Sequence, residues 1–223
     1  MRRDLERPLR LFGFLALLAL LHPACGGGTS QTSAPLFQDF FNGTVLGTGW
    51  SAPATTGMAT ATIDQTVGSP LPSLKMTTTA ATSDTVSTST TMAFDNPFVT
   101  FEIAMADIST ATSQIGTGTI TILDATSAPI ATASWNNATG QITFHINGGT
   151  DAVSNALPSD GTFHQLVFSV NSGGIGSWTL DSAAAVVMQA VTAGKLTLEL
   201  GASFGTGTAW PAFYFDNVTV TSP

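Results

Sequence analysis

Short runs of alternating apolar and polar residues cover the chain from Leu36 onward. In the clearest run, residues 99–105, the apolar side chains occupy every second position. A period of two is typical of a strand that buries one face and exposes the other. The same pattern recurs in the segments 119–122, 142–146, 165–170 and 195–200. No stretch of this part has a convincing helical period, so the pattern predicts a series of β-strands.

Turn-forming residues separate these runs. The segments 136–140 (Asn-Asn-Ala-Thr-Gly) and 171–174 (Asn-Ser-Gly-Gly) each lie between two alternating runs, which is typical of β-hairpins. Many short strands without helices between them favour antiparallel sheets packed face to face. We therefore predict an all-β sandwich, and its length suits one domain.

The N-terminal segment follows another pattern. Four arginines within the first ten residues precede an apolar run, residues 11–21, which is too short for the roughly 20 residues that span a bilayer. Small residues follow, and this order is typical of a secretory signal peptide. Cys25, the only cysteine, comes next and precedes a Gly-rich stretch. We predict three parts: a signal peptide (1–24), a flexible tether that begins at Cys25 (25–35), and the β domain (36–223).

The surroundings of Cys25 resemble the lipobox of bacterial lipoproteins, in which the cysteine is acylated and becomes the new N-terminus. Ala24 fits that pattern, whereas His22 stands where the family prefers an aliphatic residue. The resemblance implies a cell-envelope lipoprotein that contacts the membrane only through its lipid. Gly26 carries no acidic retention signal, which favours the outer membrane. Cleavage by the ordinary signal peptidase, giving a secreted soluble protein, is the alternative.

The net charge of the chain beyond residue 24 limits which classes of molecule it can bind. Beyond residue 24 the chain keeps only Lys75 and Lys195 against twelve acidic residues, a formal net charge of −10. Phosphate backbones are bound by clustered lysine and arginine, so nucleic acid is excluded as a partner. Neutral polymers and divalent cations remain compatible with this composition. Neither the charge nor the strand pattern indicates whether the chain forms oligomers.

Five segments, taken in chain order, resemble the concanavalin A-like jelly rolls, the family that includes bacterial β-glucanases, laminarinases and laminin-G-like modules. The segments are Phe37–Gly43 with Trp50, Gly161–Leu166, Trp178–Asp181, Leu198–Gly201 and Phe213–Val220. The resemblance implies an antiparallel β-sandwich with the concanavalin A-like jelly-roll topology. It also makes a glycan or a cell-surface polysaccharide the expected partner.

Catalytic residues are the weakest part of this resemblance. The glucanases of this fold carry an E-x-D-x-E strand, in which the alternation places paired carboxylates on one face. This chain lacks that triplet: Glu102 and Asp107 are five residues apart, and Glu199 stands alone. We therefore predict that the domain is not an enzyme.

Sugars stack on exposed aromatic rings, and their hydroxyl groups bond to amide and carboxylate side chains. Two tryptophans next to loops and three polar neighbours form the candidate carbohydrate site: Trp135, Asn136, Asn137, His145 and Trp210. The leading hypothesis is a lipid-anchored, non-catalytic, lectin-like module. The alternatives are a structural or adhesive envelope protein that binds another protein, and a divergent glycan-cleaving enzyme.

Asp216 is the candidate metal ligand. It has the same parity as Val218 and Val220, and a carboxylate on a buried face needs compensation. One structural Ca²⁺, held by Asp216 with Asp39 as a weaker second ligand, would supply it, and the resemblance implies such an ion. Alternatively, Asp216 accepts backbone N–H bonds or meets one of the two lysines.

Overall fold

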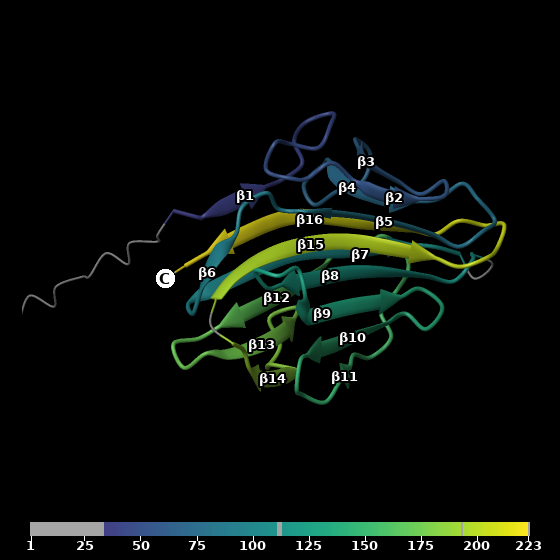
Figure 1. Cartoon of the computed structure of the whole chain (residues 1–223). Coiled ribbons are helices and arrows are strands. Elements are labelled where there is room, and N and C mark those ends of the chain that lie inside the picture. Colours follow the sequence, from purple (N-terminus) through teal and green to yellow (C-terminus); the bar gives the residue numbers. More distant parts are fainter. Residues whose placement is uncertain (1–33, 111–112, 193, 223) are drawn as a thin grey trace, which may run out of the picture. The chain divides into compact units, whose positions relative to one another are not determined.

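Two antiparallel sheets packed face to face form the described part of the chain, which in this computed structural model comprises residues 34–110, 113–192 and 194–222 (Figure 1). The first sheet has the order β14-β13-β12-β7-β16-β4-β3, with β1 also paired to β16. The second has the order β11-β10-β9-β8-β15-β5-β2, with β6 also paired to β15. No helix occurs among the described residues. The predicted antiparallel sandwich is therefore confirmed.

The strands of the first sheet are β1 (Phe37–Asp39), β3 (Thr60–Asp64), β4 (Ser73–Thr77), β7 (Val99–Ile108), β12 (His164–Val170), β13 (Ile175–Leu180), β14 (Val187–Ala190) and β16 (Ala212–Thr221). Those of the second are β2 (Ala54–Thr56), β5 (Asp84–Ser89), β6 (Phe94–Asn96), β8 (Gly116–Leu123), β9 (Pro129–Asn136), β10 (Gln141–Ile146), β11 (Ala152–Val153) and β15 (Gly194–Phe204).

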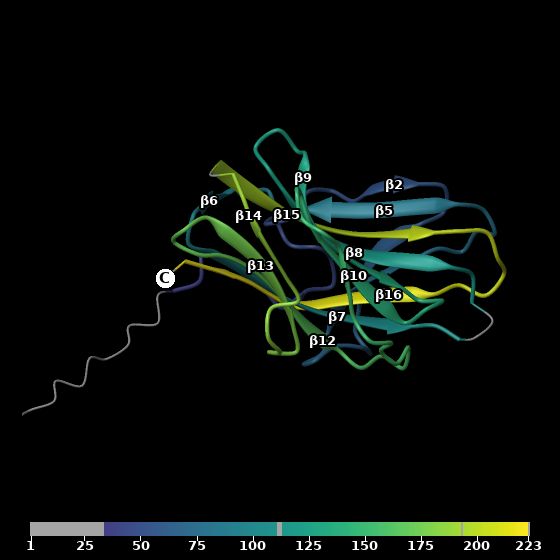
Figure 2. The same cartoon turned by 90° about the horizontal axis from the view of Figure 1, so that it is seen from below.

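The core lies between the sheets and consists of the apolar positions of each alternating run. In β7 the residues at odd positions from Val99 to Met105 are fully buried, and in β15 Leu196, Leu198 and Leu200 are buried in the same manner. These inward side chains leave the other parity of each strand on the outside of the sandwich. Figure 2, seen from below, shows the two layers of strands.

The chain moves between the sheets repeatedly, so strands that are distant in sequence become neighbours. The first strand, β1, pairs with the last, β16, with Phe37 opposite Val220. In the described ranges, no helix is long and apolar enough to cross a membrane. The predicted signal peptide and Cys25 lie outside the described residues, as do all but the last two residues of the tether.

A β-bulge interrupts β16, and it makes our prediction for the face of Asp216 wrong. The register with β7 shifts between Asp216 and Thr219, and Asn217 has a φ of 49°. Because one extra residue reverses the alternation, Asp216 does not share the face of Val218 and Val220. It has the parity of Tyr214 instead, on the outer side of the first sheet, where it is nevertheless fully buried.

Candidate functional site

The outer face of the second sheet carries three rows of residues, most of them with polar side chains, which we call the hydroxyl face. Each row crosses β10, β9, β8, β15 and β5 in that order, because directly paired residues have their side chains on the same face. The first row is His145, Thr132, Thr121, Glu199 and Ser89; the second is Thr143, Ser134, Thr119, Gly201 and Ser87; the third is Gln141, Asn136, Thr117, Ser203 and Thr85.

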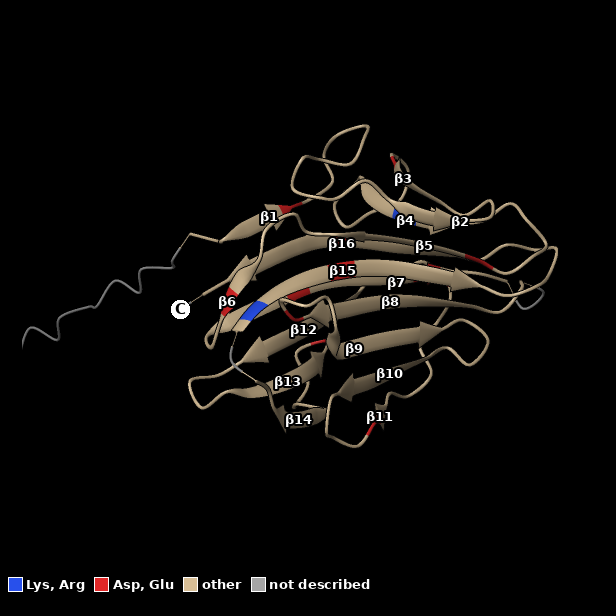
Figure 3. Cartoon of the chain, viewed as in Figure 1, with Lys and Arg blue, Asp and Glu red and all other residues tan. Residues whose placement is uncertain are grey.

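Strand parity and side-chain type explain this face. The inward positions of β8 and β9 carry isoleucine, alanine, glycine and one tryptophan, while the outward positions between them are mostly threonine and serine. Threonine suits a strand because its branched Cβ packs on the pleated surface, and its hydroxyl both donates and accepts hydrogen bonds. Figure 3 shows how sparsely charged residues are distributed over the strands. The face therefore suits a neutral ligand rich in hydroxyl groups.

Glu199 is the one carboxylate within the three rows. It lies on β15 between Thr121 of β8 and Ser89 of β5. The Ser89 hydroxyl donates to Oε2 of Glu199 at 3.3 Å. The leucine neighbours of Glu199 in the sequence predict that it points outward. Only the strand pairing shows that it lies between Thr121 and Ser89 in a polar row.

His145, at the β10 end of the same row, belongs to a hydrogen-bonded group of three side chains. Its Nδ1 lies 2.6 Å from Oδ1 of Asp151, and its Nε2 lies 3.2 Å from Oδ1 of Asn147. Both partners accept a hydrogen bond from the ring. The Asp151 carboxylate is an acceptor, and the oxygen of Asn147 faces His145 because its amide nitrogen donates to the Pro129 carbonyl. The hydrogen bond to Asp151 raises the pKa of His145. The arrangement therefore favours the doubly protonated ring, which donates hydrogen bonds and carries a positive charge.

The spacing of Glu199 and His145 limits their joint chemistry. Three strand spacings separate β10 from β15, which amounts to about 14 Å. Two carboxyl groups that share the cleavage of one glycosidic bond are about 5 to 9.5 Å apart. Glu199 and His145 are too far apart to act on the same bond, and they would contact different units of a bound chain.

Trp135 is not exposed, contrary to our prediction. It is fully buried and packs edge to face on His164, with the ring centroids 5.5 Å apart. β9 extends to Asn136, so Trp135 keeps the inward parity of Ala131 and Ala133. Its partner on β8 is Gly118, whose missing side chain leaves room for Met105 and Phe213 of the first sheet.

The other candidate carbohydrate residues do not form one site. Asn136 lies in the third row, where its Oδ1 accepts the amide of Ala138 in the turn. Asn137 turns inward and bonds the backbone of Gly116 and Gln114, which fixes the strand ends. Trp210 is 47% exposed, in the connection between β15 and β16. Of the predicted set, only His145 and Asn136 lie on the hydroxyl face.

Asp216 and Asp39 fit a calcium ion poorly. The two oxygens of Asp216 accept the amides of Ser69 and Asn217, each at 2.7 Å. Those of Asp39 accept the amide of Phe41 and the indole N–H of Trp50. Calcium takes six to eight oxygen ligands, and no cluster of three acidic, histidine or cysteine side chains occurs among the described residues. The backbone N–H bonds that we gave as the alternative account for the burial of Asp216, so calcium stays an untested prediction.

Comparisons with known proteins agree with this architecture. No protein-family model and no curated protein matches the chain. An endo-acting O-glycanase of the human gut microbiota, which initiates mucin breakdown, is similar with a TM-score of 0.63 at 12% identity, over 85% of this chain and 99% of that one. A glycoside hydrolase family 16 protein of Bacteroides ovatus, in complex with a mixed-linkage glucan product, gives 0.61 at 9% identity, over 83% and 100%.

The carbohydrate recognition domain of Emp47p is also similar, with a TM-score of 0.60 at 10% identity, over 82% of this chain and 93% of that one. The fold is that of the concanavalin A-like jelly rolls. This confirms the family resemblance in the sequence, and at such low identity it establishes the fold alone.

The same comparisons correct our functional prediction. We expected a non-catalytic, lectin-like module that is not an enzyme, whereas several of the similar structures are glycoside hydrolases, with two further endo-glucanases among them. The prediction relied on the missing E-x-D-x-E strand. Low sequence similarity leaves room for an arrangement other than that triplet. The divergent glycan-cleaving enzyme, which we gave as the third possibility, agrees better with these neighbours.

Proposed function

We propose that this domain cleaves a glycan that lies across the strands of the hydroxyl face, at the glycosidic bond over Glu199. The observation that carries the proposal is the position of Glu199, a lone carboxylate inside three rows of hydroxyl and amide groups. Its neighbours in space are the side chains of Thr121 and Ser89. The glycan-cleaving proteins of the same fold support the choice of ligand class.

The chemistry available to Glu199 is that of a single base. Its carboxylate would take a proton from a water molecule that attacks the anomeric carbon. The bond from that carbon to the bridging oxygen breaks, and the leaving oxygen takes its proton from solvent because His145 is too distant. The flanking hydroxyl groups of Thr121 and Ser89 would bond the sugar and the carboxylate. His145 lies about three sugar units away, and both of its ring nitrogens already bond Asp151 and Asn147, so it would contact a sugar only through the rest of the ring.

Substitution of Glu199 tests this proposal. We expect Glu199→Gln to lower the release of reducing ends from a susceptible glycan by at least about 100-fold, the lower range for removal of a general base. The measurement uses the full chain and a panel that includes laminarin, mixed-linkage glucan and mucin glycans. Glu102→Gln is the matched control, because Glu102 lies on the outer face of the first sheet, next to Gln165. Its activity should stay unchanged.

Two results would contradict the proposal. One is full activity of the Glu199→Gln variant. The other is a correctly folded wild-type chain that releases no reducing ends from any glycan of the panel.

We further propose that the domain works in the cell envelope, held by a lipid on Cys25. The basic segment, the apolar run and the small residues before Cys25 support this. In a bacterial host grown with labelled palmitate, we expect the label in the wild-type chain and its loss in Cys25→Ser. A wild-type chain that is exported without label would instead support cleavage by the ordinary signal peptidase.

A further inference from the structure

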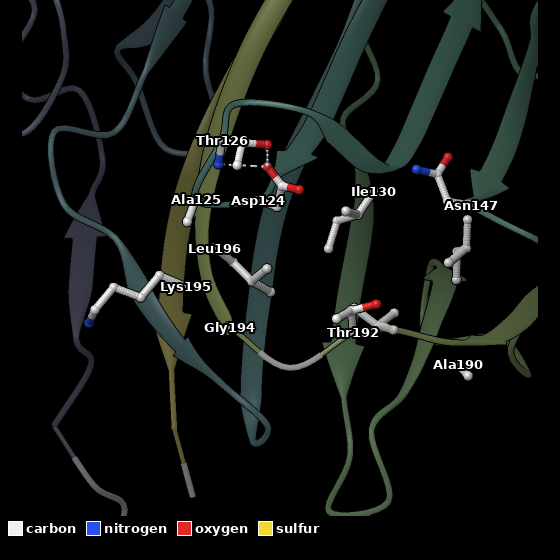
Figure 4. A pocket seen from close by; sticks show the side chains of 12 residues that line it. Asp124, Ala125, Thr126, Ile130, Asn147, Ala190, Thr192, Gly194, Lys195 and Leu196 are labelled. Carbon is white, nitrogen blue, oxygen red and sulfur yellow. Dashed lines mark hydrogen bonds between the residues drawn. The ribbon is translucent and has the colours of Figure 1, made fainter.

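A pocket, which we call the end pocket, lies at one end of the sandwich and is separate from the three rows of the hydroxyl face. It has a volume of about 380 Å³ and is lined by the β8–β9 turn, the end of β10 and the connection from β14 to β15 (Figure 4). That connection passes from the first sheet to the second. The volume falls in the range of about 300 to 1,000 Å³ that is usual for small-molecule sites.

The lining of this end pocket is apolar with a small number of polar groups. Its apolar side chains are those of Ala125, Ile130, Ile146, Ala190, Val191 and Leu196. Asp124, Thr126, Asn147 and Thr192 supply the polar groups. Lys195 also borders the pocket, but its ammonium group bonds Asp95 at 2.9 Å. The pocket therefore offers hydrogen-bond acceptors and hydroxyl groups around an apolar surface.

Three hydrogen bonds to one oxygen fix the orientation of the Asp124 carboxylate, and its other oxygen has no donor within the described ranges. Its Oδ1 accepts the amide of Thr126 at 2.7 Å, the hydroxyl of Thr126 at 2.6 Å and the amide of Ala128 at 3.0 Å. These bonds lower the pKa of Asp124, so the carboxylate is ionised at neutral pH. Its second oxygen points away from Thr126 (Figure 4), and no described residue donates to it. This oxygen is a fixed acceptor for an N–H or O–H group.

Along β9, the lining of the end pocket begins next to the first row of the hydroxyl face. Ile130 precedes Thr132 on β9 with the same parity, which places the two about 7 Å apart. Asn147, in the pocket lining, accepts the hydrogen bond of His145. A glycan on the hydroxyl face would therefore reach the pocket within one or two sugar units of His145.

We propose that the end pocket binds the acetamido group of an N-acetylated sugar unit. The methyl group would lie on Ile130 and Val191, the amide N–H would donate to the free oxygen of Asp124, and the hydroxyl of Thr192 would donate to the acetyl oxygen. A plain hexose offers the same pocket no methyl group. Binding of the acetamido group does not depend on the proposed function. The inference rests on the proposed function only for placing the rest of the glycan on the hydroxyl face.

Two tetrasaccharides with the same β-1,4 linkage test the inference: chitotetraose carries acetamido groups, and cellotetraose carries hydroxyl groups in their place. One buried methyl group and one bond to a carboxylate give an expected preference for chitotetraose of about tenfold or more in Kd. Ala190→Phe, an exposed position at the pocket, should remove that preference. Ala184→Phe, equally exposed and outside the pocket lining, should keep it.

Methyl resonances of Ile130 and Val191 provide a readout that does not depend on cleavage. N-acetylglucosamine should shift them in the wild-type chain, and glucose should not. Such shifts in a chain without glycan-cleaving activity would support the pocket while the proposed function fails. Equal affinity for the two tetrasaccharides, or equal methyl shifts with the two monosaccharides, would overturn the pocket even where Glu199-dependent cleavage is found.

Discussion

The Trp135→Ala variant is expected to lose about 3–5 kcal/mol of the free energy of unfolding, the usual cost of truncating a buried tryptophan. Trp135 is fully buried between the sheets and packs on His164. Removal of the indole leaves a cavity in the core beside the His164 ring. Denaturation in urea, monitored by circular dichroism, measures the loss.

Trp210→Ala is the matched control for this prediction. Trp210 is 47% exposed, so its truncation should change the free energy of unfolding by about 0.5 kcal/mol or less. Trp135→Phe, which keeps an aromatic ring, should recover most of the stability lost in the alanine variant. A Trp135→Ala protein with wild-type stability and weaker glycan binding would show that the indole faces a ligand, and would contradict the buried placement.

Asp216→Ala should cost about 1–3 kcal/mol, because it leaves the amides of Ser69 and Asn217 without their carboxylate acceptor. The Asn217 side chain also donates to the carbonyl of Ser69, so one of the bonds between the loop around Ser69 and β16 remains in the variant. The melting temperature with and without a chelator separates this account from the calcium prediction. Equal values are expected if the amides alone hold Asp216, whereas a fall with chelator would support an ion.

The pH dependence of the same variant has a definite sign. Burial raises the pKa of Asp216, and the nearby charge of Asp39 adds to the rise, although the two backbone bonds oppose it. A carboxyl group with a raised pKa in the folded state stabilises that state most at acidic pH, and this contribution falls as pH rises through its folded pKa. The stability difference between wild type and Asp216→Ala should therefore grow from pH 7 towards pH 4. A difference that shrinks over this range would contradict the assignment.

The strands could be predicted from the sequence because their signal is local. The alternation in residues 99–105 and 195–200 depends only on which side chains face the core, and both segments are strands with that parity. For Trp135 the sequence carries two opposed signals: the loop that follows it indicates exposure, and its parity with Ala133 indicates burial, which is the observed state. The bulge at Asn217 carries no comparable signal, so the face of Asp216 could not be predicted.

The candidate site depends on information of another kind. Glu199 and His145 share a row only because β15 pairs with β8, which pairs with β9, which pairs with β10. The pairing of β15 with β8 joins Glu199 to Thr121, segments more than fifty residues apart, and no local pattern indicates it. The outward direction of Glu199 was therefore predictable, whereas its place among threonine and serine side chains was not.

The regular repetition of the rows has a consequence for any polymer that lies on them. Neighbouring positions offer nearly the same set of hydroxyl groups, so a long chain can settle in several registers of similar free energy. In the first row, Glu199 and His145 are the two groups whose chemistry differs from that of their threonine and serine neighbours. Under the proposed function, a plain glucan would then be cut at many internal points and give a broad ladder of fragments, whereas an acetamido group in the end pocket would favour one register.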